Sequence, residues 1–216
     1  MRNRFDRQLL ELNNELIQMG SLIEQAIEMG ISALVKQDVE KAEQAIKFDV
    51  EVDEQEKTIE SLCMKLLLQQ QPVAKDLRLI SAALKMITDM ERIGDQADDI
   101  AEILLCRAGR PLSAGDTLRD MARATIRMVS ESVDAYVRQD VDLAQQVIAA
   151  DDEVDGYFDR IKAHLIDRIA KDVDDGEATL DLLMIAKYYE RIGDHATNIA
   201  EWVMFSVTGV HKTEAT

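Results

Sequence analysis

Two stretches of this sequence, DMERIGDQADDIAE and YYERIGDHATNIAE, share one spacing of acidic side chains. Residues three, four or seven apart lie on one face of a helix, so each stretch gathers its acids on one side. Like charges four residues apart cost roughly 0.2–0.5 kcal/mol per pair, so the arrangement does not serve the helix itself. Carboxylates in such an array are the donors that hard cations prefer. The acids are Glu91, Asp95 and Glu102 in the first stretch and Glu190, Asp194 and Glu201 in the second.

Two further pairs of aspartates, also four residues apart, precede these stretches: Asp49 with Asp53, and Asp151 with Asp155. Asp53 lies 19 residues before Pro72, and Glu91 lies 19 residues after it (72 − 53 and 91 − 72). Asp49 and Asp95 both lie 23 residues from Pro72. In the second half the equivalent pairs share a midpoint inside KDVDDG. Equal distances from a turn mean equal heights on antiparallel helices, so each helical hairpin is predicted to gather four carboxylates.

We interpret these eight acids as two metal sites. Four converging carboxylates repel one another unless water or a cation intervenes, and an all-oxygen set suits Mg²⁺, Mn²⁺, Ca²⁺ or iron, with Zn²⁺ as a further candidate. The alternative is a solvated acidic face, which is the usual role of an acidic run. Duplication at matched heights favours the metal sites. The first set is Asp49, Asp53, Glu91 and Asp95, and the second is Asp151, Asp155, Glu190 and Asp194.

Other polar or flexible residues lie beside the acids. Gly94 and Gly193 cost about 0.5–1 kcal/mol each inside a helix, so their recurrence needs a reason, either close helix packing or ligand access. Arg92 and Arg191 are interpreted as solvated salt-bridge partners of the acids. His195 follows Asp194 directly and so points about 100° away from it, which favours a surface or capping role over ligation.

The elements that position these residues are predicted to be helices throughout. Apolar residues recur at intervals of three and four from Phe5 to Ala33, which predicts one helix of about 30 residues. Asp38 is a predicted N-cap for the second helix, and Pro72 ends that helix. A third apolar stripe runs from Leu79 to Leu104.

The chain then repeats this programme. VKQDVEKAEQAIKFDVEVD matches VRQDVDLAQQVIAADDEVD at an offset of 102, and the two ERIGD segments are 99 apart. The sequence therefore predicts an all-α fold of two tandem three-helix bundles related by an internal repeat. Residues 1–108 form the first bundle, 109–115 the linker and 116–216 the second bundle.

Composition limits the classes of partner. Lys and Arg total 25 against 42 Asp and Glu, a formal charge of −17, which argues against binding to nucleic acid or an anionic membrane surface. Cations and basic protein surfaces are the expected partners. The sequence shows neither a secretory signal nor a stretch for membrane insertion, so a cytoplasmic protein is expected. The cysteines, Cys63 and Cys106, are predicted to be buried reduced thiols.

The sequence resembles the PhoU family of phosphate-specific transport system accessory proteins. The resemblance covers nearly the whole chain and is strongest in QPVAKDLRLISAALKMITDMERIGDQADDIAE and YYERIGDHATNIAE. The family's E/D-x-x-x-D metal motifs fall on the same eight acids. The segment PVAKDLR of the first half has no equivalent in the second, where DDGEATLDL stands.

The resemblance implies a negative regulator of the phosphate-starvation response that couples a phosphate ABC transporter, through its ATPase subunit, to a sensor histidine kinase. A homodimer and no catalytic activity are expected. The sequence offers no nucleophile beside a base and no glycine loop for phosphate. One alternative is a di-iron carboxylate enzyme, which needs Glu-x-x-His motifs that the sequence lacks. The other is an acidic helical metal-binding or scaffold protein unrelated to phosphate signalling.

Overall fold

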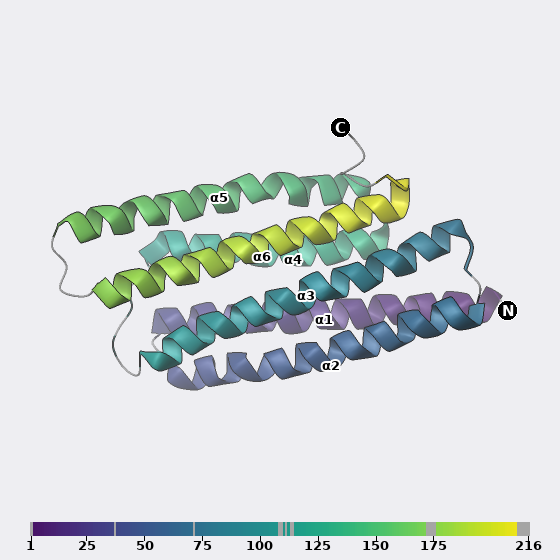
Figure 1. The fold of residues 1–216 in the computed structure, drawn as a ribbon, viewed down its shortest axis with the longest axis horizontal. Coiled ribbons are helices and arrows are strands. Elements are labelled where there is room, and N and C mark those ends of the chain that lie inside the picture. Colours follow the sequence, from purple (N-terminus) through teal and green to yellow (C-terminus); the bar gives the residue numbers. More distant parts are fainter. Residues whose placement is uncertain are drawn as a thin grey trace.

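The described part of the chain forms six helices, in the order α1 to α6 (Figure 1). The computed structural model describes residues 2–36, 38–70, 72–107, 110, 112, 115–171 and 176–210, apart from the side chains of residues 2, 3 and 70. The described residues contain no strand, and the predicted all-α fold is confirmed. Most of the predicted linker at 109–115 and most of KDVDDG lie outside the described residues. The helices are α1 Arg2–Lys36, α2 Val39–Gln70, α3 Ala74–Cys106, α4 Gly115–Arg138, α5 Val141–Ala170 and α6 Gly176–Thr208.

The internal repeat is visible in how corresponding helices begin. The Asp38 carboxylate accepts a hydrogen bond from the backbone N–H of Lys41 at 3.3 Å, just before α2. The Asp140 carboxylate, 102 residues later, does the same for Leu143 at 3.0 Å before α5. Each satisfies a helix N–H that has no partner within the helix, which confirms the predicted cap and fixes where the helix starts.

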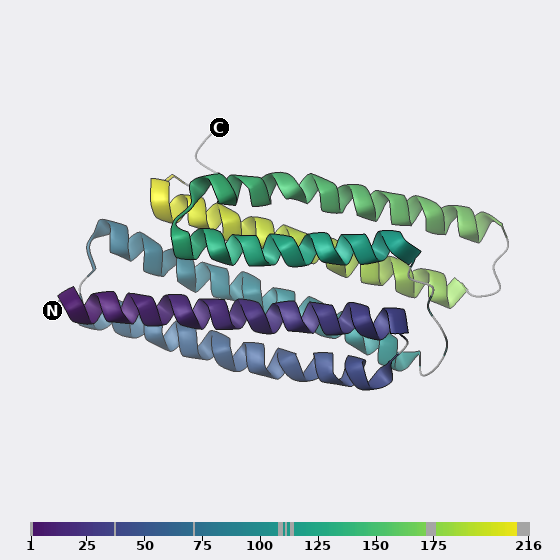
Figure 2. The same ribbon diagram turned by 180° about the vertical axis from the view of Figure 1, so that it is seen from behind.

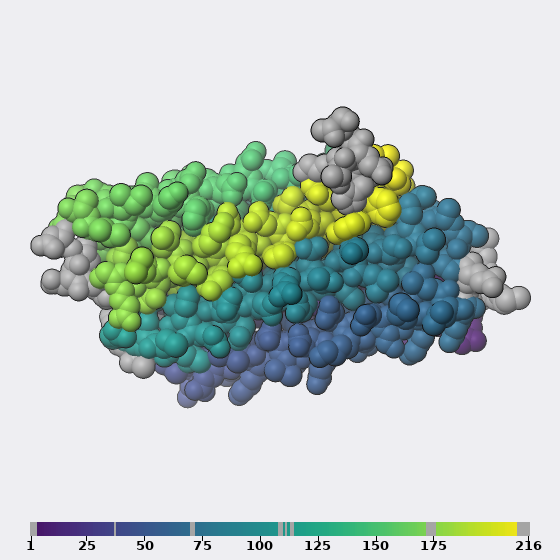
Figure 3. Space-filling model, in the orientation of Figure 1, coloured from purple at the N-terminus to yellow at the C-terminus, as the bar shows by residue number. Residues whose placement is uncertain are grey.

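The two three-helix units lie side by side along their length (Figures 1 and 2). Within the first unit α2 packs against α1 and α3, and within the second α5 packs against α4 and α6. Between the units α3 packs against α6 and α1 against α4. Figure 3 shows α3 and α6 running next to each other across one face. Buried side chains from all six helices join one hydrophobic core, so the repeat builds two units that share an interior.

The two units differ in the length of their first helix. α1 has 35 residues and α4 has 24, a difference of 35 − 24 = 11. Their last residues, Lys36 and Arg138, are related by the offset of 102, so the missing turns are at the start of α4. Seen from behind, α1 runs the length of α2, whereas α4 stops short of the α5–α6 end (Figure 2).

Two further expectations from the sequence concern membrane spans and the two cysteines. Over the described residues, every helix falls short of the length and apolar character needed to cross a membrane. Both cysteines are free thiols, and Cys63 is buried as predicted. Cys106 is exposed, contrary to the prediction. It is the last residue of α3, where the helix leaves its packed neighbours.

Candidate metal centres

The first set of acids lies beside a close contact between α2 and α3. Asp49 and Asp53 come from α2, and Glu91 and Asp95 come from α3. A Cβ built on Gly94 would lie 3.1 Å from Val52 Cγ1 and 3.5 Å from Asp49 Oδ1. Close packing is therefore a sufficient reason for this glycine, and it brings the carboxylates of the two helices together.

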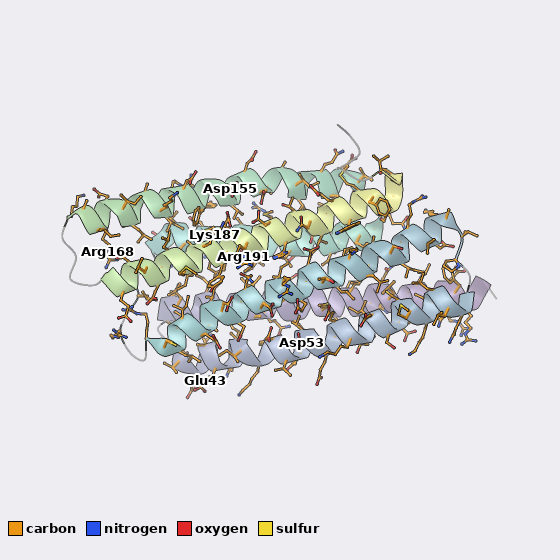
Figure 4. The ribbon with its side chains drawn as sticks, viewed as in Figure 1. Glu43, Asp53, Asp155, Arg168, Lys187 and Arg191 are labelled. Carbon is orange, nitrogen blue, oxygen red and sulfur yellow. The ribbon has the colours of Figure 1, made fainter. Side chains whose placement is uncertain are left out.

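The second set repeats this geometry between α5 and α6. A Cβ on Gly193 would lie 3.3 Å from Val154 Cγ1 and 3.4 Å from Asp151 Oδ1. Val154 and Asp151 are the repeat equivalents of Val52 and Asp49, at the offset of 102. Figure 4 labels Asp53 and Asp155 on the outer helices of the two units, at corresponding places. In each unit the helices that carry the acids are thus in close contact at the level of Asp49 and Asp151. Metal binding by the two sets stays a prediction.

The first set is electrostatically strained. Burial, and then the charges of neighbouring carboxylates led by Asp95, raises the pKa of Asp49 above its ordinary value. Burial and the Asp95 charge raise the pKa of Glu91 as well. Burial, followed by the charges of Asp49 and Glu102, raises the pKa of Asp98 to about 6. Oδ1 of Asp49 and Oδ1 of Asp98 are buried without a hydrogen-bond partner among the described residues.

In the second set of four acids the pKa values are raised in the same way, but one neighbouring acid is missing. Burial, followed by the charges of Asp155 and Asp194, raises the pKa of Asp151 to about 6. Burial and the charge of Glu190 raise the pKa of Asp194. Thr197 stands at the position of Asp98, so the second set has a lower negative charge at that level.

Basic side chains already pair with several of the outer carboxylates. Arg92 Nη1 lies 2.9 Å from Asp95 Oδ2, and Arg92 Nε lies 3.4 Å from Glu91 Oε2, as expected for a solvated partner. Lys187 pairs with Glu190 in the second set. In the part of the chain that the structure describes, no three acidic, histidine or cysteine side chains are arranged to hold one ion. Cation binding would therefore need rotation of these long or half-exposed side chains.

The donor chemistry nevertheless fits a hard cation. Both sets consist of carboxylates, and burial together with the charges of neighbouring carboxylates raises the pKa of Asp49 and of Asp151. The unpartnered Oδ1 of Asp49 faces the same contact as Gly94. A divalent cation would remove the repulsion and give this oxygen a partner.

The contact between α3 and α6 adds polar residues that sequence reasoning did not pair. Nδ1 of His195 lies 2.9 Å from Oδ1 of Asp89, and the Asn198 amide donates to the same oxygen at 3.1 Å. Burial and neighbouring acids raise the pKa of Asp99, and the Tyr188 side chain across the same contact partly offsets that rise. His195 therefore joins the two units, a role different from the surface or capping role expected. The partners lie more than 100 residues apart in the sequence, so no local spacing pointed to them.

Fold and site together define a class: an all-α protein of two repeated three-helix units that share a core, with one acidic cluster in each unit. The chain matches the family described as the PhoU domain twice, over residues 16–104 and 118–203. This protein belongs to the PhoU family. Each match covers most of one unit, as the internal repeat requires.

Individual relatives align over most of their length. The chain is 38% identical over 212 residues to a phosphate-specific transport system accessory protein PhoU homolog of Clostridium acetobutylicum, covering 96% of each chain. It is 34% identical over 208 residues to the homolog of Pseudomonas aeruginosa, covering 95% of this chain and 86% of that one.

Solved structures agree with the fold. The crystal structure of PhoU from Pseudomonas aeruginosa matches with a TM-score of 0.89 at 33% identity, over 95% of this chain and all of that one (100%). The phosphate transport system regulatory protein PhoU from Streptococcus pneumoniae matches with a TM-score of 0.88 at 25% identity, over 95% and 98% of the two chains.

Proposed function

We propose that this protein is a cytoplasmic negative regulator of the phosphate-starvation response. It acts by binding other proteins, namely the ATPase subunit of a phosphate ABC transporter and a sensor histidine kinase, and it forms a homodimer. The observation that carries the proposal is the match, over nearly the whole chain, to relatives named as accessory proteins of phosphate-specific transport.

The physical character of the protein supports binding rather than catalysis. The net charge of −17 suits docking on basic protein surfaces. Two histidines lie in the described residues: His195 is bonded to Asp89, and His164 is exposed on α5. The buried thiol of Cys63 has its pKa raised to about 12 by burial, which keeps it protonated and unreactive.

Deletion of the gene in its native host tests the regulatory proposal. The deletion strain should express a phosphate-repressed phosphatase in phosphate-rich medium, and the intact gene supplied on a plasmid should restore repression. The tagged protein should also co-purify with the transporter ATPase subunit. Normal repression in a deletion strain that has no second copy would overturn the regulatory role while leaving the fold intact.

We also propose that each acidic set binds one or more hard cations. Asp49, Asp53, Glu91 and Asp95 would hold the first, and Asp151, Asp155, Glu190 and Asp194 the second. The bound charge would offset the repulsion within each set and lock the two helices of each hairpin together. The unpartnered oxygen of Asp49 and the duplicated arrangement support this proposal.

Elemental analysis of protein purified without added metal tests the cation proposal. The pair Glu91→Gln and Asp95→Asn should lower the metal content by about half, because one of the two sets remains. The control pair, Glu40→Gln and Glu43→Gln, makes the same charge change at the start of α2, and Figure 4 labels Glu43 away from Asp53. Wild-type protein without metal, or equal metal in both variants, would contradict the proposal and leave an acidic scaffold.

A further inference from the structure

Among the described residues, α4 covers less of the second unit than the longer α1 covers of the first. In the first unit, Nη2 of Arg4 donates to Gln69 at 3.4 Å, and Nε2 of Gln55 donates to the Glu15 carbonyl at 3.1 Å. The start of α1 therefore lies along the C-terminal half of α2. That half carries apolar side chains at the contact, and Leu66 is fully buried there.

The corresponding place in the second unit is an open recess of about 260 Å³. α4 begins at Gly115, the equivalent of residue 13, so the turns equivalent to residues 2–12 are not part of the helix. Figures 1 and 2 both show that α4 begins short of the end of the bundle at which α5 ends and α6 begins. The recess is lined by Gly115, Thr117, Leu118, Arg160, Ile161, His164, Leu165, Arg168 and Leu182.

Where α4 is shorter than α1, the residues on α5 also differ in type from their equivalents on α2. Three positions that are Thr58, Leu62 and Leu66 in the first unit are Arg160, His164 and Arg168 in the second, each at the offset of 102. All three line the recess, and they repeat every four residues along one face of α5. A shorter first helix would explain polar residues at these three positions of α5. It does not explain why all three are basic.

These basic groups have no acidic partner within the described residues, and no described acid lines the recess. The acids nearby are paired with other basic residues: Asp167 with Lys171 at 2.5 Å and Asp181 with Arg107 at 2.7 Å. The Arg160 guanidinium lies over the Tyr157 ring, 4.5 Å from its centre, a contact that leaves its N–H groups available.

We propose that this recess binds a small anion of the phosphate class, either as free inorganic phosphate or as the phosphoryl groups of a nucleotide. Arginine is suited to this ligand because its planar fork donates two parallel hydrogen bonds to phosphate oxygens. Four residues of helix rise about 6 Å, so His164 lies one turn from each arginine. The Arg160 guanidinium now lies towards Tyr157, and rotation of this long side chain would bring it to an anion bound beside His164. Figure 4 shows Arg168 at the end of α5 that α4 does not cover.

Other features of the recess fit such an anion. The first N–H groups of a helix have no partner within the helix, and those of α4 begin at the lining residues Gly115 and Thr117. The volume of about 260 Å³ lies below the usual range for sites that enclose a drug-sized ligand, so a nucleotide would place its base outside. The described lining residues are basic or uncharged, so an anion meets less repulsion from them than from the acidic faces of this chain, which has 42 acids against 25 basic residues.

Titration calorimetry on the purified full-length protein, in phosphate-free buffer at constant ionic strength, tests this inference. Inorganic phosphate and adenosine diphosphate are the two probes, with chloride as the reference anion. At least one probe should bind saturably, and the double variant Arg160→Gln, Arg168→Gln should bind it at least about tenfold more weakly. Binding of phosphate identifies the free ion as sufficient, whereas binding of the diphosphate alone identifies the nucleotide.

The control is the double variant Arg123→Gln, Arg138→Gln, which makes the same charge change on exposed parts of α4. It should bind the probe within about twofold of wild type, which separates a local site from the effect of net charge. Far-UV circular dichroism checks that both variants are folded, and His164→Gln alone gives a milder test at an exposed position. No saturable binding of either probe, or equal loss in both double variants, would overturn the inference. Because the assay uses the isolated protein, its result is independent of the regulatory proposal.

Discussion

Asp98 and Asp151 each lie half-buried among other carboxylates, where burial and neighbouring charge raise their pKa from 3.8 to about 6. The folded protein therefore holds these protons over a pH range in which the unfolded chain has released them. The stabilisation that results is complete below about pH 3.8 and is lost as the pH rises through about 6. At neutral pH, both charged groups weigh against the folded state of the metal-free protein.

Replacing both residues by Asn should therefore raise the stability of metal-free protein at pH 7.5. Both groups are partly solvated, so we expect about 0.5–1 kcal/mol per site after screening. The gain should shrink as the pH is lowered to about 5, because the wild-type carboxyls are then protonated. Thermal unfolding in the presence of a chelator, at both pH values, measures the difference. A gain that is the same at both pH values would show that the effect is not one of charge.

At the scale of the helices, two glycines set how closely each hairpin can pack. The Cβ of an alanine at position 94 would lie 3.1 Å from a methyl group of Val52, which is fully buried and cannot move freely. Position 193 is similar, because the Cβ of an alanine there would lie 3.3 Å from Val154 Cγ1. A third helical glycine, Gly156, has only Arg160 Nη1 within reach, at 4.0 Å.

The three glycines should therefore respond differently to alanine. Gly156→Ala should stabilise the protein by about 0.5–1 kcal/mol, because alanine is the better helix former and meets no obstacle. Gly94→Ala and Gly193→Ala should lose that gain and cost up to about 2 kcal/mol, because overpacking separates the helices. Chemical denaturation of the three variants gives the comparison. Equal stabilisation by all three would mean that the glycines are not packing residues.

The sequence predicted the helices well because their physical signals are local. The stripe from Phe5 onward, the cap at Asp38 and the break at Pro72 each depend on residues a few positions apart. The heights of the eight acids followed as well, since a hairpin turn fixes the register of its two helices.

Contacts between the units escaped prediction because nothing local encodes them. His195 and Asp89 meet only when α6 lies antiparallel to α3, an arrangement that depends on the whole fold. The exposure of Cys106 depends on how the end of α3 packs against the neighbouring helices. The basic recess depends on the length of α4. The raised pKa of Asp98 also depends on the whole fold, because it comes from burial and from the charge of Asp49 on the neighbouring helix.

At the scale of the molecule, the two units share one core, which joins their stabilities. Fully buried side chains of α1 and α3 belong to the same packed cluster as those of α4 and α6. Separating the units would expose this surface at a cost of about 25 cal/mol for each Å² of apolar area. The shared core therefore predicts that both units unfold in a single cooperative transition, although the sequence divides into two repeats.

A substitution in one unit with a probe in the other tests this prediction. Ile59 is fully buried on α2, which packs against α1 and α3 of the first unit. The chain has a single tryptophan, Trp202, and it lies on α6, so its fluorescence reports on a helix of the second unit. Ile59→Ala should cost about 2–5 kcal/mol through lost burial and the cavity it leaves. In urea, the midpoints followed by Trp202 fluorescence and by far-UV circular dichroism should fall together by the same amount.

The exposed substitution Glu40→Gln should move neither midpoint. If Ile59→Ala lowered only part of the circular dichroism change and left the fluorescence midpoint in place, the two units would be independent folding domains, and the shared core would contribute little to their association.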